Sequence, residues 1–218
     1  MMILNRSEVK FRINEHEKLE IIKYISLFCK PESHGELGRY KVNTLYLDDI
    51  NLKSYHEKLD GDYTKTKYRL RFYDENIRHL NGEVKTKEGQ NSVKYQFPLE
   101  TSWGDSLEQV IKNNKNSFTG EVFSKRLFPV LSTSYSREAY TSLGSENIRL
   151  TFDSDLKISR KLNFEQQKQY INYPLKDYIM ELKFSTKNTW VLNLLAELEQ
   201  RKVSFSKYFH LLEYSRIN

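Results

Sequence analysis

Cysteine, proline and glycine are scarce in this 218-residue sequence. The one cysteine, Cys29, can form no disulfide within the chain, and a metal cage built from cysteines is excluded. The four prolines and eight glycines form no low-complexity segment, and no internal repeat or domain boundary is evident. The expected organisation is therefore a single domain over residues 1–218.

Long apolar runs are also missing. No window approaches the length of a membrane span, and residues 1–6 show no secretory pattern. The expected location is the reducing cytoplasm, with membrane association only through a membrane-protein partner that the sequence does not reveal. A P-loop and a GxGxxG motif are absent, so any phosphate must be bound by side chains.

Aromatic and basic residues are plentiful by contrast. Aromatic residues make up 13% of the chain, which favours a folded protein rich in strands. Lysine and arginine number 35 against 29 aspartate and glutamate, a net charge of +6. A moderate excess of this kind indicates an anionic partner only where the basic residues cluster, so their positions decide.

The periodicity of apolar residues predicts mainly strands. Helices are predicted at residues 15–29, 106–112, 189–201 and 206–214, with Cys29 as a buried helix residue. Strands are predicted at residues 7–13, 42–47, 66–73, 82–87, 92–99, 130–140, 148–153 and 178–184. These elements predict an α+β, mainly antiparallel fold: a closed eight-stranded tunnel barrel with helices packed outside.

Charged and apolar residues alternate along these strands. Lys67, Arg69 and Arg71 share one strand face, and apolar residues occupy the other. The same separation recurs in residues 8–13, 83–87, 149–153 and 180–184. For one strand the ordinary interpretation is a charged face in water. Its repetition, beside helices whose apolar stripes need a partner, favours charged faces that look into the barrel.

Clustered cations require compensating anions, because buried like charges repel and lose hydration. The carboxylates available on these faces are fewer than the cations: Glu8, Glu83, Asp153 and Glu181. A ligand is expected to supply the remaining negative charge, and phosphate oxygens suit arginine forks and lysine ammonium groups. Carboxylates among such cations would bind Mg²⁺ or Mn²⁺, which bridge phosphate oxygens.

Nine short segments, taken in their order, resemble the VTC-type polyphosphate polymerase domain, a branch of the triphosphate tunnel metalloenzyme (CYTH-like) superfamily. They are EVKFRI at 8–13, TLYLDD at 44–49, KYRLRFYD at 67–74, EVKTK at 83–87, SVK at 92–94, YSREAY at 135–140, RLTFD at 149–153, MELKF at 180–184 and SKY at 206–208. The resemblance implies a tunnel that binds ATP and a metal, transfers the γ-phosphate to a growing polyphosphate chain and releases the nucleoside diphosphate.

The resemblance also implies roles for individual residues. The catalytic residues implied are Arg69, Arg71, Lys85, Arg137, Arg149 and Glu181. The substrate-binding residues implied are Lys10, Lys94, Tyr135, Lys183, Ser206 and Lys207. Glu181 would bind the Mn²⁺ or Mg²⁺. Arg6 stands where the hydrolase branch of the superfamily has the first acidic residue of its ExExK pattern, which disfavours simple triphosphate hydrolysis.

Two alternatives stay open. The first is a triphosphatase of the same fold, in which Glu181 or Glu8 positions a water molecule. The second is a non-catalytic sensor of anions. Nucleic acid is disfavoured as a partner, because stacking requires aromatic side chains among the cations. Here Tyr68, Phe72 and Phe152 lie on the opposite strand faces.

Overall fold

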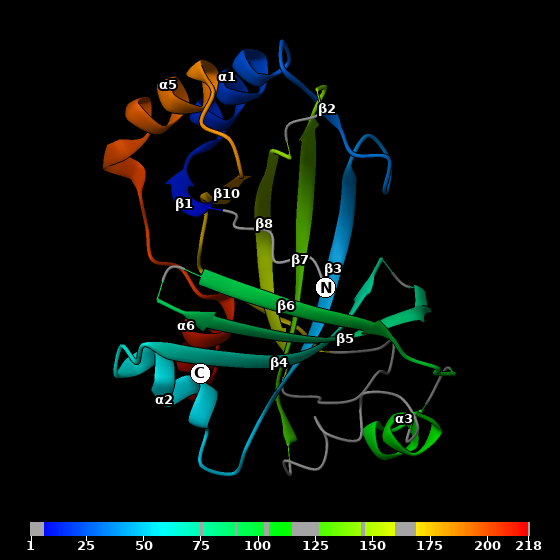
Figure 1. Ribbon diagram of the computed structural model, residues 1–218. Helices are drawn as coiled ribbons and strands as arrows, with labels where there is room; N and C mark the ends of the chain where they lie inside the picture. The colour runs from blue at the N-terminus through cyan, green and yellow to red at the C-terminus, as the bar shows by residue number, and fades with distance from the viewer. Residues whose placement is uncertain are drawn as a thin grey trace. The chain divides into compact units, whose positions relative to one another are not determined.

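The computed structural model describes residues 7–74, 76–89, 91–102, 105–114, 127–144, 147–159 and 169–217. Figure 1 shows its helices and strands. The strands are β1 (Ser7–Ile13), β2 (Cys29–Pro31), β3 (Arg39–Asp48), β4 (Thr64–Tyr73), β5 (Asn76–Glu88), β6 (Asn91–Pro98), β7 (Phe128–Ser142), β8 (Arg149–Ser159), β9 (Ile171–Asn172) and β10 (Tyr178–Phe184). The helices are α1 (Glu15–Ile25), α2 (Lys53–Leu59), α3 (Leu107–Asn113), α5 (Thr189–Glu197), the short 3-10 helix η1 (Glu199–Arg201) and α6 (Lys207–Ile217). All eight predicted strands are therefore present.

The chain divides into two compact units. Unit 1 comprises Met1–Tyr40, Tyr135–Leu156 and Pro174–Phe205, and unit 2 comprises Lys41–Ser134, Lys157–Tyr173 and Ser206–Asn218. The expectation of a single domain stays a prediction.

In unit 1, β10 pairs antiparallel with β1 on one side and with β8 on the other. The apolar residues of these strands, such as Phe11, Leu150 and Leu182, form one core with the apolar faces of α1 and α5. Asn14 caps α1 by accepting a hydrogen bond from the Glu17 amide at 2.9 Å, and the Glu17 carboxylate accepts one from the Asn14 amide at 2.8 Å. The helices therefore cover the apolar face of these strands, and the charged side chains lie on the opposite face.

Helix α1 is shorter than predicted. It ends at Ile25, where the Ser26 amide donates the last helical hydrogen bond to Ile22. Cys29 is buried as expected but belongs to β2, where it pairs with Ser142 of β7. The sequence-based placement of Cys29 in a helix is therefore wrong: the hydrogen bonds of its backbone go to a strand partner rather than to the preceding turn.

In unit 2, β4 pairs with β3 and β5, and β5 pairs with β6, all antiparallel. Leu45, Leu70 and Val84 contribute to a second apolar core on one face of this sheet. Gly82 of β5 permits a close approach, since a Cβ atom there would lie 2.1 Å from Cε2 of Phe97. The charged side chains of Lys67, Arg69 and Arg71 on β4 and of Glu83 and Lys85 on β5 lie on the other face, as the alternation predicted.

The mainly antiparallel sheet with helices is confirmed, but the sheet is not closed into a barrel. Hydrogen-bonded neighbours follow the order β1-β10-β8-β7-β3-β4-β5-β6, and in the described ranges the end strands β1 and β6 do not pair with each other. Backbone groups near residue 202 occupy the open edge of β1: Val203 donates to the Lys10 carbonyl at 2.9 Å, and Phe11 forms a bridge with Lys202. Part of this edge of β1 is therefore already hydrogen-bonded to the segment that follows η1.

Among the described helices, none has the length and apolar character that crossing a bilayer requires.

Candidate functional site

Three lysines face one another across the sheet of unit 2. Lys67 of β4 lies directly opposite Lys85 of β5, and Lys85 lies directly opposite Lys94 of β6. Directly opposed residues share a sheet face, and neighbouring strands are roughly 4.8 Å apart. Like charges in this register destabilise a sheet. We call Lys67, Lys85 and Lys94 the lysine row; a multiply charged anion would compensate it.

Glu83 supplies negative charge beside the lysine row. Its carboxylate accepts hydrogen bonds from Arg69 Nε at 2.5 Å and from Lys94 Nζ at 2.7 Å, and it lies 3.5 Å from Arg71 Nη1. Burial would raise the pKa of Glu83, but the charges of Arg69, Arg71 and Lys94 outweigh burial and hold that pKa well below its usual range. Of the described side chains on this face of β4, β5 and β6, Glu83 is the only carboxylate. Positive charge therefore remains in excess.

The lysine row reaches the start of helix α6. Lys67 Nζ donates to Ser206 Oγ at 2.8 Å, and Ser206 Oγ accepts from the Phe209 amide at 3.3 Å. Ser206 is therefore the cap of α6, and Lys207 is the first residue of that helix. A helix N-terminus carries partial positive charge, so it adds to the field of the lysines. Lys67 was expected on this face but was not among the predicted site residues.

In unit 1, opposite charges face each other instead. Glu8 of β1 lies opposite Lys183 of β10, and Lys10 lies opposite Glu181. The Lys183 ammonium is 2.7 Å from Glu181 and 4.0 Å from Glu8, and the Lys10 ammonium is 3.4 Å from Glu8 and 3.7 Å from Glu181. Burial would raise the pKa of Glu181, but Lys183 and Lys10 hold it well below its usual range. Carboxylates thus compensate these lysines without a ligand.

The two predicted site arginines of unit 1, Arg137 and Arg149, are also paired with carboxylates. Arg137 of β7 forms a bidentate pair with Asp153 of β8, with distances of 2.7 and 2.8 Å. Arg149 of β8 is paired with Glu32, which follows β2. Glu32 was not among the predicted site residues, because it lies in a polar segment with no periodic signal.

The carboxylates of unit 1 could supply some, but not all, of the ligands of a hard metal ion. Glu8 and Glu181 share two ammonium groups, which shows that the two carboxylates lie close enough to share a cation. Within the described ranges there is no group of three histidine, cysteine, aspartate or glutamate side chains that could bind a metal ion. Mg²⁺ commonly takes one or two protein carboxylates and completes its shell with phosphate oxygens and water. These donors therefore fit a metal that arrives with a phosphate ligand, and the assignment of the metal to Glu181 stays a prediction.

The predicted site residues thus fall into two groups. Unit 1 contains Lys10, Tyr135, Arg137, Arg149, Glu181 and Lys183. Unit 2 contains Arg69, Arg71, Lys85, Lys94, Ser206 and Lys207. Each group is clustered by strand pairing or side-chain contacts, and the roles of the individual residues stay predictions.

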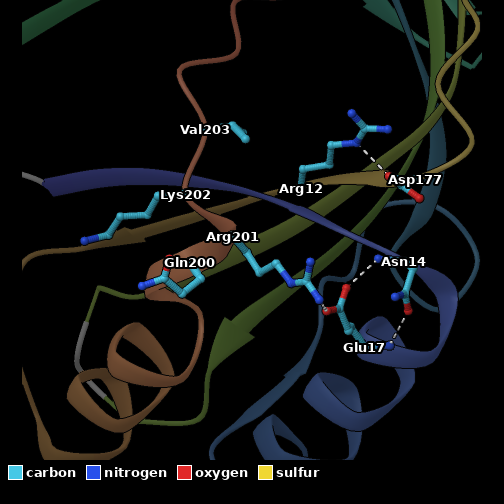
Figure 2. A pocket seen from close by; sticks show the side chains of 8 residues that line it. All are labelled: Arg12, Asn14, Glu17, Asp177, Gln200, Arg201, Lys202 and Val203. Atoms are coloured by element: carbon cyan, nitrogen blue, oxygen red, sulfur yellow. Dashed lines mark hydrogen bonds and ion pairs between the residues drawn. The ribbon is translucent and has the colours of Figure 1, made fainter.

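Unit 1 also contains a pocket of about 350 Å³, which is lined by other residues (Figure 2). Its cations already have partners: Arg12 Nε is 2.6 Å from Asp177, and Arg201 is 2.5 Å from Glu17. None of the predicted site residues lines it. We therefore do not assign the pocket to phosphate binding.

Comparison with known proteins decides the family. The model of the VTC domain matches residues 5–215. The chain belongs to the VTC domain family. The resemblance drawn from the nine sequence segments is thereby confirmed.

One relative of this VTC-domain chain is the vacuolar transporter chaperone complex subunit 4 of Schizosaccharomyces pombe. The two are 24% identical over 258 residues, which cover 92% of this chain and 36% of the relative. The VTC-domain chain therefore spans about a third of the length of that protein.

Two crystal structures of proteins described as candidate adenylate cyclases share the fold. The protein from Bacillus halodurans has a TM-score of 0.51 at 12% identity, with 93% of this chain and 95% of that chain covered. The protein from Vibrio parahaemolyticus has a TM-score of 0.52 at 11% identity, with 92% and 94% covered. At these identities the likeness concerns the fold alone.

Proposed function

We propose that this VTC-domain chain is a polyphosphate polymerase, which transfers the γ-phosphate of ATP to a growing polyphosphate chain with Mg²⁺ or Mn²⁺. The observation that carries the proposal is the lysine row, because three lysines in direct register suit an anion with charges repeated along its length. A single phosphate would meet fewer of these ammonium groups at once. The relative named as a chaperone complex subunit adds support from the family.

Phosphate transfer between ATP and a polyphosphate chain requires that the reactants be positioned, and it requires no enzyme nucleophile. Phosphoryl transfer is accelerated mainly by aligning the reactants and by neutralising charge on the transferred group. The terminal phosphate of the acceptor is already anionic and attacks the γ-phosphate in line. Arg69, Arg71 and Lys85 would bind phosphate oxygens, and Lys94 and Lys67 would extend that binding along the chain.

The residues of unit 1 would have a related role. Arg137 and Arg149 would bind phosphate oxygens, with Lys10 and Lys183 as further cations. Glu181 would bind the metal ion, which supplies charge neutralisation for the phosphates when bound. Tyr135 and Ser206 would act as neutral hydrogen-bond donors. We also propose that the chain works in the cytoplasm and reaches a membrane through a membrane-protein partner, since the S. pombe relative is named as a subunit of a complex.

The test is the product formed from ATP labelled at the γ-phosphate. Purified protein is incubated with labelled ATP and Mn²⁺ or Mg²⁺, and the products are separated on a gel that resolves polyphosphate lengths. A ladder of labelled chains together with ADP is expected. Labelled free phosphate alone would instead establish a triphosphatase. Tight binding of triphosphate without any turnover would establish a sensor.

A further inference from the structure

Two arginines of unit 1, Arg137 on β7 and Arg149 on β8, are bound in the same way. Arg137 donates from Nε and Nη2 to the two carboxylate oxygens of Asp153, at 2.7 and 2.8 Å. Its Nη2 also donates to the Tyr135 hydroxyl at 3.3 Å. One edge of the guanidinium group is therefore taken up by an acid and a tyrosine.

Arg149 repeats this arrangement with residues from elsewhere in the chain. It donates from Nε to Glu32 Oε1 at 2.5 Å and from Nη2 to Glu32 Oε2 at 3.0 Å. Its Nη2 also donates to the Tyr40 hydroxyl at 2.9 Å. The same two nitrogens thus contact a carboxylate and a tyrosine in both cases.

Each guanidinium group therefore has an edge left over. Arginine has five N–H donors, two of them on Nη1. In the described part of the chain, Nη1 of Arg137 and Nη1 of Arg149 form no hydrogen bond. The side chains of Arg137 and Arg149 are 10% and 23% exposed, so both keep some contact with solvent.

The backbone around Glu32 is fixed on both sides. The Glu32 amide donates to the Ala139 carbonyl, and the Ala139 amide donates to the Gly38 carbonyl, both at 2.9 Å. Gly38 has a φ of 76°, and a Cβ atom there would lie 2.5 Å from the Ala139 carbonyl oxygen. The loop that carries Glu32 is thus hydrogen-bonded to Ala139 of β7, and only glycine at position 38 allows the two backbones to approach so closely.

We propose that Glu32 and Asp153 are positioning residues, each of which fixes one arginine so that its Nη1 edge is presented to a phosphate oxygen. The inference rests on the proposed function, because it assigns Arg137 and Arg149 to phosphate binding. If each carboxylate only competed with phosphate for its arginine, there would be no reason for a tyrosine hydroxyl to accept from Nη2 in both cases. Nor would there be a reason for Nη1 to be left over in both. Bidentate arginine–carboxylate pairs fix orientation as well as charge.

The test uses Glu32→Gln, which keeps the size of the side chain and removes its charge. Tripolyphosphate is titrated by calorimetry into the full chain without metal, at one fixed ionic strength. Loss of a hydrogen-bonded charge partner is expected to weaken tripolyphosphate binding about tenfold. Unchanged or tighter binding would overturn the proposal, and tighter binding would identify Glu32 as a competitor of phosphate.

The same substitution in a protein that lacks the Arg149 side chain shows whether Glu32 acts through Arg149. In an Arg149→Ala protein, Glu32→Gln is expected to cause no further loss of affinity; the same loss in both backgrounds would contradict the proposal. Tyr40→Phe gives a milder test that does not depend on the folding of the Glu32 variant. It should weaken binding in the wild-type background and not in Arg149→Ala, and an equal effect in both would count against positioning.

Glu36→Gln is the matched control, because Glu36 is an exposed acid of the same loop. It should bind tripolyphosphate as the wild type does. The two proposals also fail separately. A wild type that binds tripolyphosphate but makes no polyphosphate overturns the polymerase alone, whereas a Glu32→Gln protein that binds and polymerises normally overturns positioning alone.

Discussion

Lys67 and Lys85 lie directly opposite each other on β4 and β5, and Lys94 continues the line on β6. Opposed like charges cost stability in a sheet, so such a register is expected where function requires it. In unit 1 the comparable positions pair Glu8 with Lys183 and Lys10 with Glu181. The excess of positive charge is therefore clearest on β4, β5 and β6.

Removing the middle lysine should stabilise the ligand-free protein. Lys85→Met relieves repulsion on both sides, and we expect the free energy of unfolding to rise by about 0.5 kcal/mol. Stabilisation by tripolyphosphate should shrink at the same time. Denaturant unfolding with and without tripolyphosphate measures both effects. Lys30→Met, at an exposed lysine of β2, is the control and should change neither.

Arg69 and Arg71 should be required for turnover and not for folding. We expect Arg69→Ala and Arg71→Ala each to abolish polyphosphate synthesis while the circular dichroism spectrum stays unchanged, because Leu70 carries the packing of this strand and is only 2% exposed. Leu70→Asp is the contrasting variant and should unfold or aggregate, since it buries an unpaired charge. Normal turnover in both arginine variants would remove this face from the site.

Lys94 should make tripolyphosphate binding depend on pH near neutrality. Burial, with a contribution from Arg69 and Arg71 and against the opposing effect of Glu83, lowers the pKa of Lys94 to about 8. Its side chain is 39% exposed, so solvent will moderate this effect.

Lys94 should lose its charge as pH rises through about 8. An unfolded lysine keeps its proton up to its usual pKa of 10.5, so this residue should make the ligand-free protein more stable as pH rises from about 8 towards that value. Affinity for tripolyphosphate should fall over the same range, and binding near pH 8 should take up a proton. Calorimetry in buffers of different ionisation enthalpy measures that uptake. Lys94→Met should abolish it, and persistence in the variant would assign the proton elsewhere.

Glu181 should matter for metal-dependent turnover more than for phosphate binding. Glu181→Gln releases the ammonium groups of Lys10 and Lys183, so tripolyphosphate should bind as well as before, or more tightly, without metal. Turnover should fall by orders of magnitude because the metal loses a carboxylate ligand. Affinity without metal and rate against Mn²⁺ concentration are measured for both proteins. An unchanged dependence on Mn²⁺ would exclude Glu181 as a ligand.

The alternation of charge along single strands could be predicted from the sequence, because it needs only the period of a strand. The register of Lys67, Lys85 and Lys94 could not, because it depends on which strands pair and with what offset. Helix α2 was missed for a similar reason. The Ser54 and Tyr55 amides in its first turn donate to the carboxylate of Asp48 at the end of β3, at 3.0 and 3.2 Å, so this capping group lies six and seven positions away in the sequence.

Tertiary partners also changed which face of α1 is buried. Leu19 stands at helical spacing from Ile22 and Ile25 in the sequence, which would place it on the same apolar face, yet Leu19 is 55% exposed and Lys18 is buried. Lys18 pairs with Glu138 of β7 at 2.9 Å, a contact that no local pattern reveals. Glu32 escaped prediction in the same way, since its importance lies in contacting Arg149, which is 117 positions away.

The most direct measurement is a calorimetric titration of wild type and Lys85→Met with tripolyphosphate and with orthophosphate. If the lysine row binds a chain of phosphates, wild type should bind tripolyphosphate at least about tenfold more tightly than orthophosphate, since each further phosphate meets further ammonium groups. Raised salt should weaken this preference. Lys85→Met should reduce the affinity for tripolyphosphate far more than that for orthophosphate. Equal affinities for the two anions in the wild type, or a preference that survives unchanged in Lys85→Met, would contradict the assignment of β4, β5 and β6 to polyphosphate.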